Sequence, residues 1–136
     1  MRSTLIDAGP LIALFDRSDK YHTAAMRFIE NYHGSLVTTW PVVTEAHYML
    51  NFSLKSQSSL LEWMNRGAVQ LFSLSETHLE RLLFLTKKYD DVPMDLADAT
   101  LMVAAEEMKI NEIVSIDSDF YIYRNIRNEY LTNIFR

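Results

Sequence analysis

The stretch DLADATLMVAAEE, residues 95–107, reads as a helix that opens with two aspartates three residues apart. This spacing places Asp95 and Asp98 on one face of a single helical turn. Asp95 follows Pro93 and suits the N-cap position, where a carboxylate stabilises a helix by ~0.3–1 kcal/mol. Asp98 is either an ordinary first-turn acid or a ligand. The pair is therefore a helix start, half of a metal site, or both.

Outward from this stretch, strand patterns alternate with helical patterns. Short apolar runs that favour strands occupy residues 3–7, 35–40, 68–74, 111–117 and, as a short fifth strand, 130–135. Helical patterns occupy residues 10–16, 24–32, 41–52, 58–66, 75–90 and 95–107. Ser18 or Asp19 is expected to cap the second of these helices. The alternation predicts an α/β fold with a central, mostly parallel sheet of four to five strands flanked by helices.

Length and composition narrow the class of protein. The chain has 136 residues, which suits a single domain over residues 1–136. A hydrophobic fraction of 49% with only three Gly and three Pro favours a compact globular protein. No apolar run reaches the ~20 residues of a membrane span, and no signal-peptide pattern is present. With no cysteines, disulfides and thiolate metal sites are excluded, and we expect a cytoplasmic protein without membrane contact.

Acidic residues fall where the predicted elements meet. Asp7 ends the first strand, Asp117 ends the fourth, and Glu45 lies near the start of the helix after the second strand. In a parallel α/β fold, the carboxyl ends of strands and the amino ends of helices lie at one edge of the sheet. We therefore expect these acids to lie close to Asp95 and Asp98.

A cluster of carboxylates without a counter-charge is unfavourable, because each one raises the proton affinity of its neighbours. Mg²⁺ and Mn²⁺ are hard cations that prefer such oxygen ligands. Ions of this kind assist phosphodiester hydrolysis. The net charge of −5 means that binding to nucleic acid would need cations, a local basic strip or a partner protein.

Four motifs, in order and over the whole length, resemble those of PIN-domain ribonucleases, in particular the VapC-type toxins of toxin–antitoxin pairs. The motifs are LIDAGPLIALFD (5–16), TEAHYML (44–50), DLADATLMVAAEE (95–107) and VSIDSDF (114–120). The resemblance implies a PIN-like three-layer fold. It implies that the catalytic and metal-binding acids are Asp7, Glu45, Asp98 and Asp117. Asp95 and Asp119 accompany them in secondary positions. The sequence departs from the family at Ala8 and Ser115, where a hydroxyl residue and Thr, respectively, are common.

The resemblance implies a Mg²⁺- or Mn²⁺-dependent endoribonuclease that uses water as nucleophile and leaves a 5′-phosphate. It further implies an RNA substrate, a cognate antitoxin protein and a homodimer. Three cations that follow elements near the acidic edge are candidate phosphate contacts, namely Arg17, Lys20 and Lys55. His22 is expected to make a structural contact rather than a catalytic one.

Two other functions compete with this interpretation. A phosphotransfer enzyme with Asp7 as nucleophile would need a second acid near position 9 and a lysine after a late strand. Gly9 and Asp117 occupy those places. A catalytically silent PIN-fold binding module is the other alternative, and the four retained acids count against it. A nuclease assay with and without chelator separates all three.

Overall fold

The computed structural model describes residues 2–92, 94–117, 120 and 122–135. Its strands are β1 (Ser3–Ile6), β2 (Ser35–Thr38), β3 (Val69–Leu71), β4 (Glu112–Val114) and β5 (Thr132–Asn133). Its α-helices are α1 (Ala8–Phe15), α2 (His22–Asn31), α3 (Trp40–Met49), α4 (Leu54–Asn65), α5 (Leu79–Lys88) and α6 (Leu96–Met108), and a short 3₁₀ helix, η1 (Glu76–His78), leads into α5. The predicted alternation of strands and helices is confirmed.

Within the described residues the sheet has five strands in the order β3-β2-β1-β4-β5, and every neighbouring pair is parallel. From β1 the chain adds β2 and β3 on one side and then β4 and β5 on the other. The strand order therefore reverses between β1 and β4. In open parallel sheets, the crevice beyond the carboxyl ends of the strands at such a reversal is the usual binding site.

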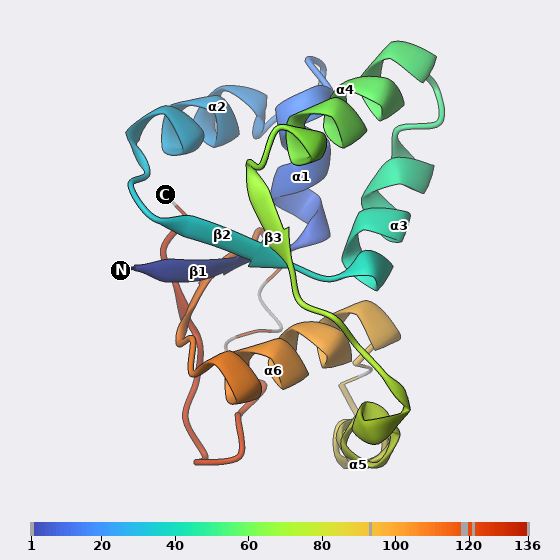
Figure 1. Cartoon of the computed structure of the whole chain (residues 1–136), viewed down its shortest axis with the longest axis vertical. Helices are drawn as coiled ribbons and strands as arrows, with labels where there is room; N and C mark the ends of the chain where they lie inside the picture. Colours follow the sequence, from blue (N-terminus) through green and yellow to red (C-terminus); the bar gives the residue numbers. More distant parts are fainter. Residues whose placement is uncertain (1, 93, 118–119, 121, 136) are drawn as a thin grey trace.

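Helices cover both faces of the sheet (Figure 1). The helices α1 to α4 lie on one side of the sheet, and α5 and α6 lie on the other. Every residue of α6 from 97 to 105 is buried, which explains why this stretch of sequence lacks a polar face. The three-layer α/β arrangement expected from the sequence is thus confirmed.

Local side-chain contacts set where several helices begin. The carboxylate of Asp95 accepts a hydrogen bond of 2.8 Å from the backbone N–H of Asp98, so Asp95 is the N-cap of α6. Ser53 caps α4 in the same way, through the N–H of Ser56, and α4 begins four residues before the predicted start.

The predicted cap of α2 was wrong. This helix begins at His22, and its N-cap position is Tyr21 rather than Ser18 or Asp19. The Asp19 carboxylate instead accepts a hydrogen bond of 2.8 Å from the N–H of Tyr21. The polar side chain therefore closes the turn that precedes the helix, a common alternative role for Asp.

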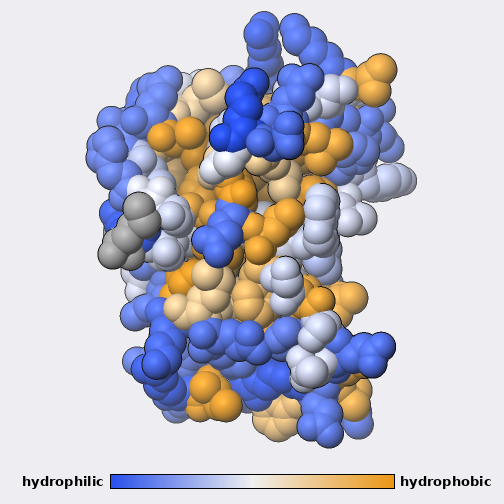
Figure 2. Space-filling view, in the orientation of Figure 1, coloured by the Kyte–Doolittle hydropathy of each residue, from blue (hydrophilic) through white to orange (hydrophobic). Residues whose placement is uncertain are grey.

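Apolar surface is spread across the middle of one face of the molecule, between hydrophilic surface at both ends (Figure 2). Among the described residues, no helix combines the length and apolar character that crossing a membrane requires.

Candidate functional site

Three aspartates far apart in the sequence meet at the edge where the strand order reverses. Asp7 follows β1, Asp117 follows β4 and Asp98 lies in the first turn of α6. Each offers a carboxylate oxygen, and these three oxygens all lie within 4.8 Å of one another. The fold thus brings together the acids that the parallel topology led us to expect at one edge.

Two further acids lie in the wall of the same cavity. This cavity has a volume of about 360 Å³ and is lined by Asp7, Ala8, Gly9, Ile12, Glu45, Met49, Asp95, Asp98, Ile116 and Asp117. We call it the acidic cavity. Burial raises the pKa of Glu45, and the nearby carboxylates Asp95 and Asp117 raise it further. Glu45 therefore shares the electrostatic environment of the three aspartates.

Asp7 is buried and held at both carboxylate oxygens. One oxygen accepts a hydrogen bond of 2.8 Å from the N–H of Ala8, and the other accepts one of 3.0 Å from the Ser115 hydroxyl. Burial raises the pKa of Asp7 to about 6. The two hydrogen bonds lower this pKa, whereas the charges of Glu45 and Asp117 raise it. Desolvation outweighs the hydrogen bonds.

Asp98 is similarly buried, and its pKa is raised to about 8. Burial is the largest cause, followed by repulsion from Asp7, Asp95 and Asp117. The hydroxyl of Tyr123 donates a hydrogen bond of 3.2 Å to Asp98 Oδ2 and lowers the pKa in part. Without a cation, Asp98 therefore holds a proton at neutral pH.

Sequence reasoning noted Ser115 only as a departure from the family pattern and assigned no role in holding the acids to Ser115, Tyr123 or Asn133. The Ser115 hydroxyl donates to Asp7 and accepts a hydrogen bond of 3.0 Å from the N–H of Asp117. The side-chain amide of Asn133, in β5, makes two hydrogen bonds to the backbone of Ser115. Its oxygen accepts one of 3.2 Å from the Ser115 N–H, and its nitrogen donates one of 2.8 Å to the Ser115 carbonyl oxygen. The position of Ser115 two residues before Asp117 was an available signal. Nothing comparable in the sequence marked Tyr123 or Asn133.

The donor set of the acidic cavity fits a hard divalent cation. Its charged side chains are all carboxylates, and no Lys or Arg is among the described residues that line it. Buried carboxylates with raised pKa values are relieved either by protons or by a cation. Oxygen-only ligands suit Mg²⁺ or Mn²⁺. Asp119, expected as a secondary acid, lies outside the described residues.

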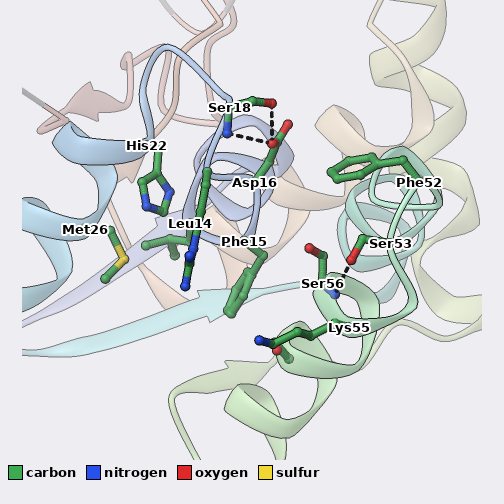
Figure 3. Close-up of a pocket in the computed structure, with 12 residues that line it drawn as sticks. Leu14, Phe15, Asp16, Ser18, His22, Met26, Phe52, Ser53, Lys55 and Ser56 are labelled. Carbon is green, nitrogen blue, oxygen red and sulfur yellow. Dashed lines mark hydrogen bonds between the residues drawn. The ribbon is translucent and has the colours of Figure 1, made fainter.

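The predicted phosphate contacts lie elsewhere. Arg17 and Lys55 line a second cavity, of about 740 Å³, formed by the end of α1 and the starts of α2 and α4. Figure 3 shows His22 and Met26 on one side of this cavity and Phe52 on the other. We call it the second cavity.

Two further side chains near this region make local contacts. The Lys20 ammonium lies 5.1 Å from the centroid of the Tyr21 ring. His22 Nδ1 lies 2.7 Å from the carbonyl oxygen of Ala13, in hydrogen-bonding distance and consistent with the structural contact expected for His22. Neither Lys20 nor His22 lines the acidic cavity.

Comparisons with known proteins identify relatives that are similar in sequence or in fold. The ribonuclease VapC26 of Mycobacterium tuberculosis is 26% identical over 115 residues, covering 83% of this chain and 85% of that protein. Among solved structures, M. tuberculosis VapC20, a Sarcin-Ricin loop cleaving toxin, superposes with a TM-score of 0.79 at 17% identity, over 88% of this chain and 93% of that chain.

Two further solved structures share the fold. A toxin–antitoxin complex from Klebsiella pneumoniae matches with a TM-score of 0.64 and 19% identity, covering 86% of this chain and 89% of that chain. VapBC2 from Rickettsia felis, bound to a DNA fragment from its promoter, matches with a TM-score of 0.64 and 14% identity, covering 96% and 98%. The sequence profile of the PIN domain matches residues 4–125. Because that match spans most of the sequence, the chain belongs to the PIN domain family.

Proposed function

We propose that this PIN domain is a Mg²⁺- or Mn²⁺-dependent endoribonuclease and the toxin of a toxin–antitoxin pair. The observation that carries the proposal is the meeting of Asp7, Asp98 and Asp117, whose carboxylate oxygens lie within 4.8 Å of one another, in the wall of one cavity. Membership of the PIN family and the similarity to ribonuclease VapC26 support the same activity.

In this proposal the carboxylates of Asp7, Asp98 and Asp117 hold the ion, with Glu45 beside them. When bound, the ion supplies Lewis-acid activation of a water molecule and offsets negative charge on the phosphodiester. Ser115 and Tyr123 keep the carboxylates in position through their hydrogen bonds. Glu45, whose pKa is raised, accepts the proton of the attacking water at its carboxylate. The P–O3′ bond breaks, the leaving 3′-oxygen takes a proton from solvent, and the two products carry a 5′-phosphate and a 3′-hydroxyl.

The test is cleavage of a mixture of single-stranded and structured RNAs by the purified protein with Mg²⁺ or Mn²⁺. We expect cleavage with either ion, loss of cleavage in excess chelator, and recovery when the ion is restored. Glu30→Gln, which removes an exposed acid of α2, serves as the matched control and should cleave like the parent. Full activity in excess chelator would contradict metal dependence. RNA binding without cleavage under every condition would favour the silent binding module.

The toxin role implies a cognate antitoxin, and we further propose a homodimeric, cytoplasmic protein. The similar structures from K. pneumoniae and R. felis were solved as toxin–antitoxin assemblies. The acidic cavity offers a binding site for an arginine of the antitoxin, because an arginine side chain forms charge-assisted hydrogen bonds with clustered carboxylates.

Expression in a bacterial host tests this role. We expect growth arrest by the chain alone, rescue by co-expression of the adjacent gene, and harmless expression of Asp7→Asn. Arrest by Asp7→Asn as well would show that the harm does not come from the acidic cavity. Normal growth with the soluble parent protein would contradict the toxin role.

A further inference from the structure

Another hollow, distinct from the second cavity, adjoins the acidic cavity. An exposed tryptophan, Trp40, lies in its wall. The hollow has a volume of about 460 Å³ and is lined by Trp40, Pro41, Thr44, Glu45, Asp95, Leu96 and Ala97. Glu45 and Asp95 also line the acidic cavity, so the two spaces share a wall. A ligand that extends out of the acidic cavity past these two residues reaches Trp40.

The position of the backbone at Trp40 is set by the start of α3 and by a hydrogen bond between Thr39 and Thr100. Trp40 is the first residue of α3, and Pro41 occupies the first turn, where its fixed φ suits a helix start. The hydroxyl groups of Thr39 and Thr100, both buried, lie 2.7 Å apart and hydrogen-bond the start of α3 to α6. Figure 1 shows the start of α3 close to the start of α6. The fold thus holds this aromatic side chain beside the N-terminus of α6.

The exposure of Trp40 differs from that of the other tryptophan. Trp40 is 56% exposed and lines this hollow, as well as a neighbouring cavity on α3. Trp63 is only partly exposed and packs edge-on against Phe15, with ring centroids 5.6 Å apart. Trp63 is therefore part of the packing, whereas the ring of Trp40 offers an accessible face.

The charges around this face decide what can bind there. Among the described residues that line the two spaces, the charged ones are all acids, namely Asp7, Glu45, Asp95, Asp98 and Asp117. A phosphate is repelled by these walls wherever no cation intervenes. A nucleobase is uncharged, and its stacking on an aromatic side chain contributes ~1–3 kcal/mol. Stacking on Trp40 is therefore a contact that these walls can make with a strand beyond the cation.

We propose that Trp40 is a stacking platform for one nucleobase of single-stranded RNA, next to the phosphodiester held in the acidic cavity. This inference rests on the proposed ribonuclease function and adds a residue that binds one base of the substrate. The base must be unstacked from its neighbours to lie on the indole, which an unpaired segment allows and a continuous duplex does not. Trp40 binds substrate without touching the reacting atoms.

The experiment compares Trp40→Ala and Trp40→Phe with the parent in steady-state cleavage of a single-stranded oligoribonucleotide with Mg²⁺. Losing ~1–3 kcal/mol of stacking corresponds to a rise in KM of roughly 5- to 150-fold for Trp40→Ala, with kcat within about twofold. Trp40→Phe keeps an aromatic face and should restore most of the affinity. Phe52→Ala removes a ring of similar exposure, 61%, at the second cavity and should leave KM unchanged.

Fluorescence supplies a readout that does not depend on turnover. The same RNA, mixed rapidly with the parent, should quench tryptophan emission before cleavage, and Trp40→Phe, which retains Trp63, should lose this quenching. Unchanged KM in Trp40→Ala, or quenching that persists in Trp40→Phe, would overturn the proposal. A lower molecular mass of Trp40→Ala in light scattering would also overturn it, by assigning Trp40 to a contact between two copies of the chain.

Failure of the proposed function is distinguishable from failure of this inference. If the parent cleaves no RNA, the ribonuclease assignment fails, and the quenching measurement alone decides whether Trp40 binds a nucleobase. If the parent cleaves RNA and the Trp40 variants match it in KM and quenching, the ribonuclease assignment stands and the platform is wrong. Far-ultraviolet circular dichroism of each variant verifies folding.

Discussion

The two ends of α1 open into cavities of opposite character. At the amino end, the acidic cavity has buried carboxylates, and Asp7 and Asp98 are each only 6% exposed. At the carboxyl end, the larger second cavity combines the acid Asp16 with the exposed cations Arg17 and Lys55 and with several serines. Exposed charges of both signs remain hydrated, so they change the free energy of folding only slightly. Buried like charges destabilise it unless protons or a cation relieve them, and natural proteins keep such arrangements at functional sites.

The largest expected effect is on RNA cleavage. It is tested by comparing one substitution in the acidic cavity with one in the second cavity. Asp98→Asn keeps the side-chain size and removes a proposed ligand, so RNA cleavage should fall to background. Asp16→Asn in the second cavity should cleave like the parent, because the amide oxygen can still accept the hydrogen bonds from Ser18. Gel-based cleavage assays measure both. Loss of activity in Asp16→Asn equal to that in Asp98→Asn would remove the distinction between the cavities.

The free energy of unfolding should depend on pH, because the acidic cavity contains two buried aspartates with raised pKa values. Asp7 and Asp98, with pKa values of about 6 and about 8, bind protons more tightly in the folded protein than in the unfolded chain, where their pKa is near 3.8. Their contribution to the unfolding free energy of the metal-free protein is therefore fully present below pH 3.8 and should be lost as pH rises through about 6 for Asp7 and about 8 for Asp98. Each titrating group contributes at most about 1.4 kcal/mol per pH unit.

Urea unfolding in chelator at pH 5, 6.5 and 8 measures this slope. Asp98→Asn should flatten it and should be no less stable than the parent at pH 8, because the variant removes a charge that the fold holds at a cost. Mg²⁺ should weaken the slope, since the ion replaces the protons. Metal-free stability that rises between pH 5 and 8 would mean that the carboxylates have favourable partners instead.

A smaller effect is expected from Tyr123→Phe, which removes the hydrogen bond to Asp98 Oδ2 and keeps the buried ring. Loss of such a supporting contact typically lowers metal affinity by about 10- to 100-fold. Calorimetric titration with Mn²⁺ measures the change. Tyr32→Phe is the matched control, because the Tyr32 hydroxyl donates to Thr4, which does not line the acidic cavity. Equal Mn²⁺ affinity in all three proteins would show that Tyr123 does not support the ligands.

The smallest effect concerns Asp95, which both caps α6 and lines the acidic cavity. Asn caps a helix about as well as Asp, so Asp95→Asn should keep most of the cleavage activity. Asp95→Ala should lose ~0.5–2 kcal/mol of unfolding free energy, the usual contribution of a cap. Thermal unfolding and cleavage assays measure the two variants. A stable but inactive Asp95→Asn would place Asp95 among the metal ligands.

Much of the fold could be predicted from local patterns. The apolar runs of the strands, Pro41 at the start of α3 and Asp95 at the start of α6 depend on neighbours within a few residues, and the structure agrees with each. The start of α2 could not be predicted in this way. Asp19 has the chemistry of a cap but bonds within the preceding turn, and local sequence does not distinguish these two uses.

The sequence by itself determined which acids end strands or begin helices, and parallel topology then predicted that they share an edge. Only the tertiary structure decided how these acids are held. Ser115 and Asp7 are 108 positions apart, and Tyr123 and Asp98 are 25 apart, so neither hydrogen bond follows from a local pattern. The exposure of Trp40 beside the acids was likewise decided by packing. Hydrophobic periodicity and capping act between near neighbours, whereas burial, raised pKa values and cavities arise when distant segments exclude water together.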